Sequence, residues 1–348
     1  ATLPAVLSAG TAAVFEAATT NYISSAFDSN SNKIVIAYRH NGNSNYGTAI
    51  VGTVSGTSIS FGTPVVFETA DSGSISATFD SNANKVVISY DDNGNSSYGT
   101  AIVGTVSGTS ISFGTPVVFI SSLVEGTSSA YDSTNNKTAI AFINASGHLG
   151  AIVATLSGTS LTFGSVATNS LASNFPCAVF DPVNNKIVIA YKQSVGTASV
   201  CTISGTSISL GTPVVFNNSN TQQLSGAYNV DKSNIVFVGY QSGATGIAVV
   251  GTVSGTSISF GSVITFESGE IGFTSSVYDS VAKKTLAAYQ DTANSYYGTA
   301  TVFTQSAGVL TIASDYYVQT DGSLSTTTST VKAGQAVSAT TINMKDLT

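Results

Sequence analysis

Charged residues are rare in this chain: they make up only 8% of its 348 residues. A typical soluble domain carries about 25% charged residues. Basic residues are fewer than acidic ones. The chain has 11 lysines and arginines and 18 acidic residues, which gives a net charge of −7 and a sequence pI near 4.6. Nucleic-acid phosphates need clusters of Lys and Arg, so we predict no nucleic-acid partner.

Long apolar runs are also missing. A membrane-spanning helix needs roughly 18 unbroken apolar residues, and no stretch approaches this length, so we predict no membrane insertion. The low charge does not indicate disorder, because Val, Ile, Phe and Tyr are too frequent. The start, residues 1–4, lacks the basic end and apolar core of a signal peptide. We therefore expect a processed chain or a fragment of something longer.

What the chain does have is a six-fold internal repeat of about 50 residues. A Ser-Gly-Thr-Ser phrase occurs five times, and its sixth copy has decayed at residues 306–309. An aromatic residue followed by Asp or Asn recurs at intervals of 52, 52, 49, 48 and 50 residues. These aromatic residues are Phe27, Phe79, Tyr131, Phe180, Tyr228 and Tyr278.

Each repeat contains four strand signals, which in the first repeat cover residues 23–27, 33–38, 46–54 and 58–67. The second signal is almost continuously apolar, so we expect it to be buried on both faces. Helix should be nearly absent. Four antiparallel strands in a unit of roughly 40–50 residues form the blade pattern of a β-propeller. We predict an all-β, six-bladed β-propeller over residues 1–312, with a β-solenoid and a string of small sandwiches as alternatives.

The two ends of the repeat region predict that the ring is closed. Residues 8–16 resemble residues 60–68, so the chain begins with the second half of a repeat. The N-terminal segment can then complete the last blade and remove exposed sheet edges. Residues 313–348 are predicted to be a short C-terminal β tail for packing or assembly. It should contain a hairpin around Asp321-Gly322 and one more strand over 331–347.

The loops on the two faces of the predicted disc differ. The turns after the first strand are near copies, as in 28–33 and 80–85, whereas the loops after the second strand diverge. Repeated turns are typical of scaffold and varied loops of recognition, although drift in unconstrained loops gives the same pattern. The candidate ligand-binding residues on these loops are Arg39, His40, Asn45, Tyr46, Asp91, Asp92, Tyr98, Lys192, Gln241, Gln290, Asp291 and Tyr296.

Carbohydrate is the ligand that these loops favour. Tyrosine offers a flat apolar face and a hydroxyl, which suit a sugar ring. The same tyrosines could instead begin the third strand and pack between blades. The pairs Asp91/Asp92 and Glu267/Glu270 could serve as acid and base, but nothing in the sequence fixes their geometry. We therefore assign no catalytic residues and predict that the protein is not an enzyme.

Three further absences restrict the chemistry. Propellers of the sialidase type carry an Asp-box motif with Trp and a cluster of arginines, whereas this chain has no Trp and one arginine. Residues 28–32 resemble the start of a calcium loop but lack its Gly and distal Glu, so we predict no metal and no cofactor. Cys177 and Cys201 fall on strands about 10 Å apart. A disulfide needs roughly 7 Å, which favours two buried thiols.

The repeat unit over residues 54–67, with its aromatic-Asp-Ser-Asn turn, resembles repeats in marine bacteriophage tail-fibre and related virion proteins. Residues 317–325 and 332–341 are similar to segments that recur in those proteins. The resemblance covers nearly the whole chain. It implies a structural or receptor-binding role on a virion, commonly as a trimer for fibres, and no functional residue carries over.

The sequence leads to three functional hypotheses. The first is a non-enzymatic phage virion appendage whose variable loops recognise host-surface glycan. The second is a virion decoration or structural protein without receptor binding, and the third is a secreted glycan-acting enzyme. The expected partners are other virion subunits, further copies of this chain and host cell-surface polysaccharide, and the expected location is virion or extracellular.

Overall fold

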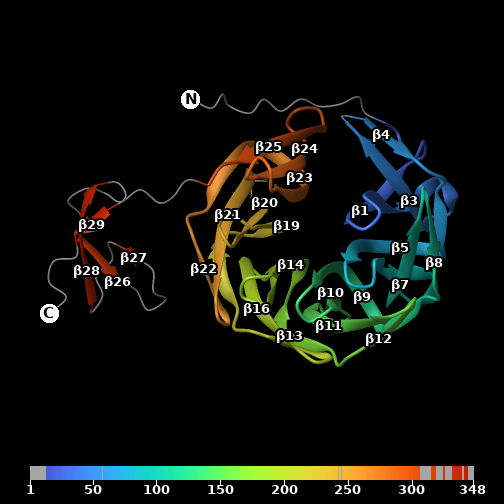
Figure 1. The fold of residues 1–348 in the computed structure, drawn as a ribbon, viewed down its shortest axis with the longest axis horizontal. Coiled ribbons are helices and arrows are strands. Elements are labelled where there is room, and N and C mark those ends of the chain that lie inside the picture. The colour runs from blue at the N-terminus through green and yellow to red at the C-terminus, as the bar shows by residue number, and fades with distance from the viewer. Residues whose placement is uncertain are drawn as a thin grey trace. The chain divides into compact units, whose positions relative to one another are not determined.

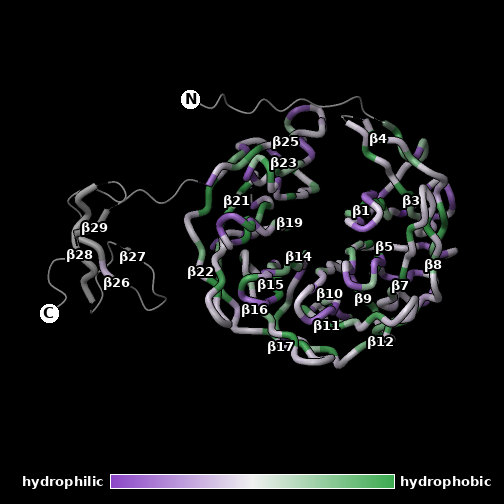
Figure 2. Tube along the Cα trace, viewed as in Figure 1, coloured by the Kyte–Doolittle hydropathy of each residue, from purple (hydrophilic) through white to green (hydrophobic). Residues whose placement is uncertain are grey.

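The computed structural model describes residues 13–56, 58–241, 243, 245–305, 315–318, 324–325, 331–338 and 341–343. The chain divides into two compact units, residues 1–302 and 303–348. The first unit holds the six repeats. Its strands follow one another around a common centre, with β1, β9, β14 and β19 on the inner side (Figure 1). In Figure 2, apolar and polar stretches alternate along every repeat of this unit.

The first three repeats share one 13-stranded antiparallel sheet. Its strands are β1 (Thr20–Asp28), β2 (Lys33–His40), β3 (Tyr46–Ser55), β4 (Ser58–Phe61), β5 (Val65–Asp80), β6 (Lys85–Asp92), β7 (Tyr98–Ser107), β8 (Ser110–Phe113), β9 (Val117–Asp132), β10 (Lys137–Asn144), β11 (His148–Ser157), β12 (Ser160–Phe163) and β13 (Ala167–Ala172).

The fourth repeat forms a 5-stranded sheet, and the fifth and sixth share a 7-stranded sheet. Their strands are β14 (Asn174–Asp181), β15 (Lys186–Lys192), β16 (Gly196–Ser204), β17 (Ser207–Leu210), β18 (Val214–Asn217), β19 (Thr221–Asn229), β20 (Asn234–Gln241), β21 (Thr245–Ser254), β22 (Ser257–Phe260), β23 (Ile264–Asp279), β24 (Lys284–Asp291) and β25 (Tyr297–Phe303).

Three strands of 16 residues join neighbouring repeats. The first part of β5 pairs with β3, and its second part pairs with β6 of the next repeat. The strands β9 and β23 do the same farther along the chain. The fourth and first strands that the sequence predicts as separate elements are therefore continuous at these junctions. The predicted break around Gly62 and Pro64 is present, because β4 ends at Phe61 and β5 begins at Val65.

The hydrophobic core lies between consecutive repeats. The middle strand of the second repeat, β6, is buried along almost its whole length, as its apolar run predicts. One cluster packs Val35 and Val51 of the first repeat against Ile88 and Ile102 of the second. Fully burying one such side chain stabilises the fold by about 1.5–3 kcal/mol. The only helical elements in the described residues are two 3-10 turns, η1 (Asn41–Asn43) and η2 (Asn93–Asn95).

The turns after each first strand are held by the Asp or Asn side chain that ends the strand. Asp28 Oδ1 accepts hydrogen bonds from the backbone of Asn30 at 2.9 Å and Ser31 at 3.0 Å. The same two bonds recur in the other five repeats. An Asx side chain bonded in this way is a turn-forming device. The aspartate that resembles the start of a calcium loop is thus engaged by the backbone.

The first strands of neighbouring repeats are tied together by small hydrogen-bonding side chains. Ser24 Oγ accepts from the backbone of Ala77 at 3.0 Å, and Ser76 Oγ accepts from Ser129 at 3.0 Å. In the same way, Ser128 Oγ accepts from the backbone of Ala178, and Ser225 Oγ accepts from the backbone of Ser276. Cys177 occupies this position in the fourth repeat, where its thiol is bonded by the backbone of Gly226.

Both cysteines are free and buried, as predicted. Burial raises the pKa of the Cys177 thiol and that of the Cys201 thiol to about 12, so both stay protonated near neutral pH. A buried thiol of this kind behaves as a small apolar side chain with a weak donor.

The second unit contains a 4-stranded antiparallel sheet of β26 (Asp315–Val318), β27 (Leu324–Ser325), β28 (Val331–Ser338) and β29 (Thr341–Asn343). The predicted hairpin is confirmed in its strands, since Val318 pairs with Leu324. Its Asp-Gly turn lies outside the described residues. The single strand predicted over 331–347 is wrong, because β28 and β29 are two strands that pair with each other.

Candidate functional site

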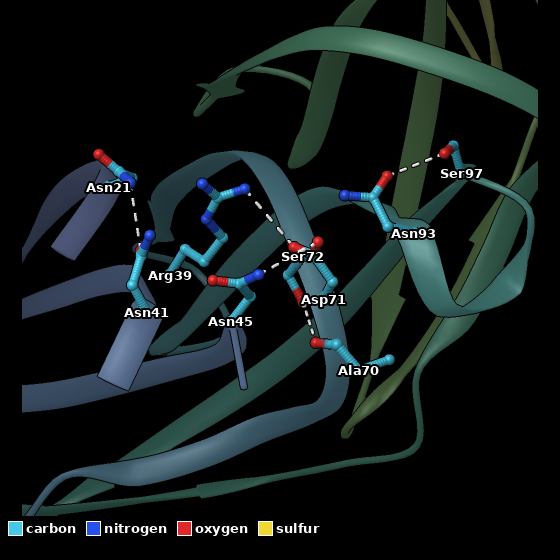
Figure 3. A network of polar contacts seen from close by, with 9 residues as sticks. All are labelled: Asn21, Arg39, Asn41, Asn45, Ala70, Asp71, Ser72, Asn93 and Ser97. Carbon is cyan, nitrogen blue, oxygen red and sulfur yellow. Dashed lines mark hydrogen bonds and ion pairs between the residues drawn. The ribbon is translucent and has the colours of Figure 1, made fainter. Parts of the chain in front are cut away.

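The varied loop of the first repeat lies beside β5, the strand that joins the first repeat to the second, and Arg39 contacts that strand. Arg39 ends near the carboxylate of Asp71 on β5, with Nη1 at 3.5 Å from Oδ1. Asn45 Nδ2 donates to the other oxygen of Asp71 at 3.4 Å. Figure 3 shows these side chains converging from β2, the loop that follows it and β5. We call Arg39, Asn45, Asp71 and Asp91 the junction site.

The far side of Arg39 faces β1. The guanidinium carbon lies 4.8 Å from the centre of the Tyr22 ring, a cation–π distance. The amides of Asn21 and Asn41 face each other at 3.2 Å (Figure 3). With the Asn21 amide turned the other way, its oxygen also accepts from Arg39 Nη2 at 3.3 Å. Arg39 Nε is buried and has no hydrogen-bond partner among the described residues.

Asp91 is the most unusual group of the junction site. It is only 9% exposed, and its Oδ1 atom has no hydrogen-bond partner in the described part of the chain. Burial raises the pKa of Asp91 to about 6; the charges of Asp71 and Glu125 raise it too, and Arg39 opposes them. A buried carboxyl with a pKa near neutrality, surrounded by further charges, is typical of a functional position.

A glycine makes room for this carboxyl. Gly73 lies opposite Asp91 in the register of β5 and β6. A Cβ atom at residue 73 would lie 2.5 Å from Asp91 Oδ1. Such a distance is a clash, so any other residue at position 73 would displace the carboxylate.

Loop length separates the repeats into two groups. Five residues, 41–45, 93–97 and 292–296, follow the second strand in the first, second and sixth repeats. Three residues, 145–147, 193–195 and 242–244, follow it in the third, fourth and fifth. We call the two groups the long-loop repeats and the short-loop repeats.

Each long loop ends in two residues with left-handed backbone. Ser44 and Asn45 have φ values of 54° and 63°, and Tyr296 has 63°. Ser96, Ser97 and Ser295 complete the three pairs. Non-glycine residues in this region cost of order 1–3 kcal/mol and cluster at functional sites.

The long-loop repeats also share a buried tyrosine–glutamate pair. The Tyr90 hydroxyl donates to Glu68 at 2.9 Å, and the Tyr289 hydroxyl donates to Glu267 at 3.4 Å. In the first repeat, the Tyr38 hydroxyl donates to Glu16 at 3.2 Å. Burial raises the pKa of Tyr90, as does the charge of Glu68, so the hydroxyl keeps its proton. The short-loop repeats have Phe142, Tyr191 and Gly239 at this position.

The structure brings together some of the predicted residues. Arg39, Asn45 and Asp91 belong to the junction site. His40 Nε2 lies 3.5 Å from Glu16 Oε1, beside the Tyr38 pair. Asp92 and Asp291 are buried and accept bonds from the backbone of Asn95 and Asn294, at 3.1 and 3.0 Å. These two carboxylates therefore stabilise the backbone of the loops that follow them.

Other predicted residues lie elsewhere. Tyr46 and Tyr98 begin β3 and β7 and are only partly exposed, which agrees with a packing role. Tyr296 is 68% exposed on its long loop. Lys192, Gln241 and Gln290 lie on the fourth, fifth and sixth repeats, away from the junction site, and Gln241 accepts from Asn217 Nδ2 at 3.1 Å.

The register gives the counterparts of Arg39 and His40 in the fifth repeat. In the structure, Tyr240 pairs with Gln222 as Arg39 pairs with Asn21, so Tyr240 is the counterpart of Arg39. Gln241 is therefore the counterpart of His40.

Sequence reasoning missed Asp71 and Glu125 as site residues. Both lie within 16-residue strands, where the fourth strand of one repeat runs into the first strand of the next. The signal was present, because residue 71 is acidic in one of the varied connections between repeats. Without the register, nothing placed it opposite Arg39.

The junction site can bind hydrogen-bonding groups and exchange a proton. The amides of Asn21, Asn41 and Asn45 supply donors and acceptors. Within the described residues, no three His, Cys, Asp or Glu side chains are grouped as metal ligands. No helix in that part of the chain has the length and apolarity to cross a membrane.

Comparison with known proteins gives a fold but no family. No family model matches the chain, and no curated protein matches it. Among solved structures, a leech intramolecular trans-sialidase has a TM-score of 0.58 at 9% identity and covers 86% of this chain and 70% of its own. An AofleA mutant from Arthrobotrys oligospora has a TM-score of 0.55 at 9% identity, with coverages of 81% and 82%.

A third similar structure is the intramolecular trans-sialidase from Ruminococcus gnavus, with a TM-score of 0.51 at 11% identity and coverages of 78% and 90%. These neighbours are β-propeller-like proteins, so the all-β, antiparallel, propeller-like fold is confirmed. At such low identity the likeness shows the fold alone.

The neighbours correct the first functional hypothesis. A non-enzymatic virion appendage was the leading interpretation of the sequence, and the similar structures favour the glycan-acting alternative instead. The repeat phrase on which that interpretation rested is rich in Ser, Thr and Gly. These residues favour strands and turns, and they do not indicate a catalytic or binding site.

Proposed function

We propose that this chain is an extracellular, glycan-acting β-propeller whose carbohydrate site is the junction site. The observation that carries the proposal is Asp91, a buried carboxyl with an unpaired oxygen and a pKa of about 6. Glycoside hydrolysis uses a carboxylic acid that protonates the leaving group and a second carboxylate nearby. Asp91 supplies the acid, and Asp71 or Glu125 supplies the second carboxylate.

The asparagines around Arg39 support binding of a sugar at this place. Amides and a cation at the ends of several elements are the groups that hydrogen-bond to sugar hydroxyls. The exposed ring of Tyr296, on the long loop of the sixth repeat, offers a stacking face that would lie on the adjacent blade of a closed ring. The left-handed residues of the long loops hold these groups in a fixed backbone conformation.

The test is turnover of a panel of polysaccharides by the intact chain, with Asp91→Asn as the variant. Loss of the general acid should lower the rate by 10²–10⁴-fold. Shortening loop 93–97 to the three residues of 145–147 should abolish turnover, and circular dichroism melting checks that this variant is folded. The matched control is an exchange between the short loops 145–147 and 193–195, which should leave turnover intact. Turnover that survives in Asp91→Asn would exclude the assigned role.

We also propose that six blades close into a ring through the N-terminal segment. The rings of Phe15 and Tyr38 lie 5.2 Å apart at 66°, and those of Phe67 and Tyr90 lie 5.3 Å apart at 62°. Glu16 bonds to Tyr38 as Glu68 bonds to Tyr90. Residues 15 and 16 thus contact the first repeat as the fourth strand of a preceding blade would. Residues 8–12 of the proposed clasp lie outside the described residues.

A further inference from the structure

The junction site has a strongly one-sided charge. Asp91 is flanked by Asp71 and Glu125, both of which disfavour additional negative charge there. Glu68 acts in the same direction on the neighbouring Asp92. Arg39 is the one arginine of the chain, so little positive charge is available to balance these carboxylates.

That arginine is already engaged. Asp71 lies 3.5 Å from its Nη1, and the Tyr22 ring covers its other side. Five of the lysines begin β2, β6, β10, β15 and β24, at the opposite ends of those strands from the varied loops. A carboxylate or sulfate on a ligand would therefore meet the negative charges of Asp71, Asp91 and Glu125, and the one arginine beside them already pairs with Asp71.

Two buried atoms of the junction site have no partner in the described chain: Arg39 Nε, a donor whose positive charge Asp71 already balances, and Asp91 Oδ1. Asp91 Oδ1 is an acceptor, more than nine-tenths buried as a residue and without a partner in the described chain. An unpaired buried acceptor costs free energy until a donor reaches it. Sugar hydroxyl and ammonium groups are donors, whereas a sugar carboxylate is only an acceptor.

We infer that the glycan taken by the junction site is non-acidic: a neutral or amino sugar that donates a hydroxyl or ammonium hydrogen to Asp91. This inference rests on the proposed function and narrows it to a substrate class. It separates the chain from the trans-sialidases among its structural neighbours, one of which is complexed with 2,7-anhydro-Neu5Ac.

The experiment is direct binding of three matched oligosaccharide series to the full chain by calorimetry, at pH 7 and low salt. The series are glucosamine oligomers, N-acetylglucosamine oligomers and oligomers of an acidic sugar such as galacturonate. The first two arms distinguish an ammonium donor from a hydroxyl donor. At least one of them should bind tenfold or more tightly than the acidic series, which corresponds to about 1.4 kcal/mol.

Two variants sharpen the result. Asp91→Asn should reduce the preference for glucosamine over N-acetylglucosamine, because the amide carries no charge. Asp71→Asn should release Arg39 and strengthen binding of the acidic series severalfold, a gain that misfolding would not produce. Circular dichroism melting confirms that each variant is folded.

The outcomes are distinguishable. Equal or tighter binding of the acidic series would overturn the non-acidic assignment while the proposed glycan site stands. A failure of every series to bind, together with no turnover of any polysaccharide, would overturn both proposals. Binding of a non-acidic series that is insensitive to Asp91→Asn and Asp71→Asn would place the sugar elsewhere and overturn the assignment to this site.

Discussion

The long-loop and short-loop repeats are built on one strand pattern, yet only the long-loop repeats combine five-residue loops, left-handed residue pairs and tyrosine–glutamate pairs. The short-loop repeats replace the tyrosine partner with Phe142, with a Tyr191 that bonds to Ser199 at 3.1 Å, or with Gly239. The long-loop repeats are the sixth, first and second, which would be adjacent in a closed ring. Specialised chemistry would then occupy one side of that ring.

The largest expected effect concerns the N-terminal clasp. Replacing Phe15 by Ala removes its contacts with Tyr38 and Phe61, at ring distances of 5.2 and 6.0 Å. Phe→Ala substitutions in packed positions cost about 3–5 kcal/mol, so chemical denaturation should show a loss approaching that of Phe67→Ala. A neutral Phe15→Ala, next to a strongly destabilising Phe67→Ala, would mean that the first and last repeats are not joined through residue 15.

The second prediction concerns pH and Asp91, whose charged neighbours are Asp71, Glu125 and Arg39. The pKa of this carboxyl is about 6 in the folded protein and about 3.9 in the unfolded chain. The folded state therefore binds the proton more strongly, and stability falls as pH rises from about 4 to about 6. Two pKa units correspond to roughly 2–3 kcal/mol.

Asp91→Asn should remove this loss. The variant should be more stable than the parent at pH 7 by up to that amount and nearly equal to it at pH 3, in urea unfolding at both pH values. A variant that is less stable at pH 7 would show that the carboxylate contributes to the fold instead of being strained by it.

The third prediction contrasts two buried tyrosines. Tyr90→Phe leaves the partly buried Glu68 carboxylate without its hydroxyl donor, and loss of a hydrogen bond to a charged group costs about 1.5–3 kcal/mol. Tyr191→Phe loses a bond to Ser199, a hydroxyl that can rotate to another partner. Thermal unfolding should therefore show the greater loss for Tyr90→Phe, and the reverse order would remove the energetic distinction between the two groups of repeats.

The smallest expected effect concerns Cys177, which lies at the position of the bridging serines in other repeats. Cys177→Ser restores the residue found at Ser128 and Ser225 and keeps an acceptor for the backbone of Gly226. The change in unfolding free energy should stay within about 1 kcal/mol. A much larger loss would show that the fourth repeat packs this position differently.

Much of the fold could be predicted from the sequence because the repeat is local. The buried second strand, the Asx turns after the first strand and the break before Val65 each follow from a few neighbouring residues. The continuous strand β5 could not be predicted from the sequence, because its two parts pair with different repeats. The position of Gln241 within its repeat shows the same limit, since only pairing with β19 sets its register.

By itself, the sequence determined the six-fold period, the strand content and the face on which the loops vary, because spacing and propensity are properties of neighbouring residues. The tertiary structure decided which charged residues of those loops and strands come together. Arg39, Asp71, Asp91 and Glu125 lie on three successive repeats, and their charges interact only after β5 and β9 cross between them. The raised pKa of Asp91 is likewise a product of burial, because a carboxyl is desolvated only by residues that the fold brings around it.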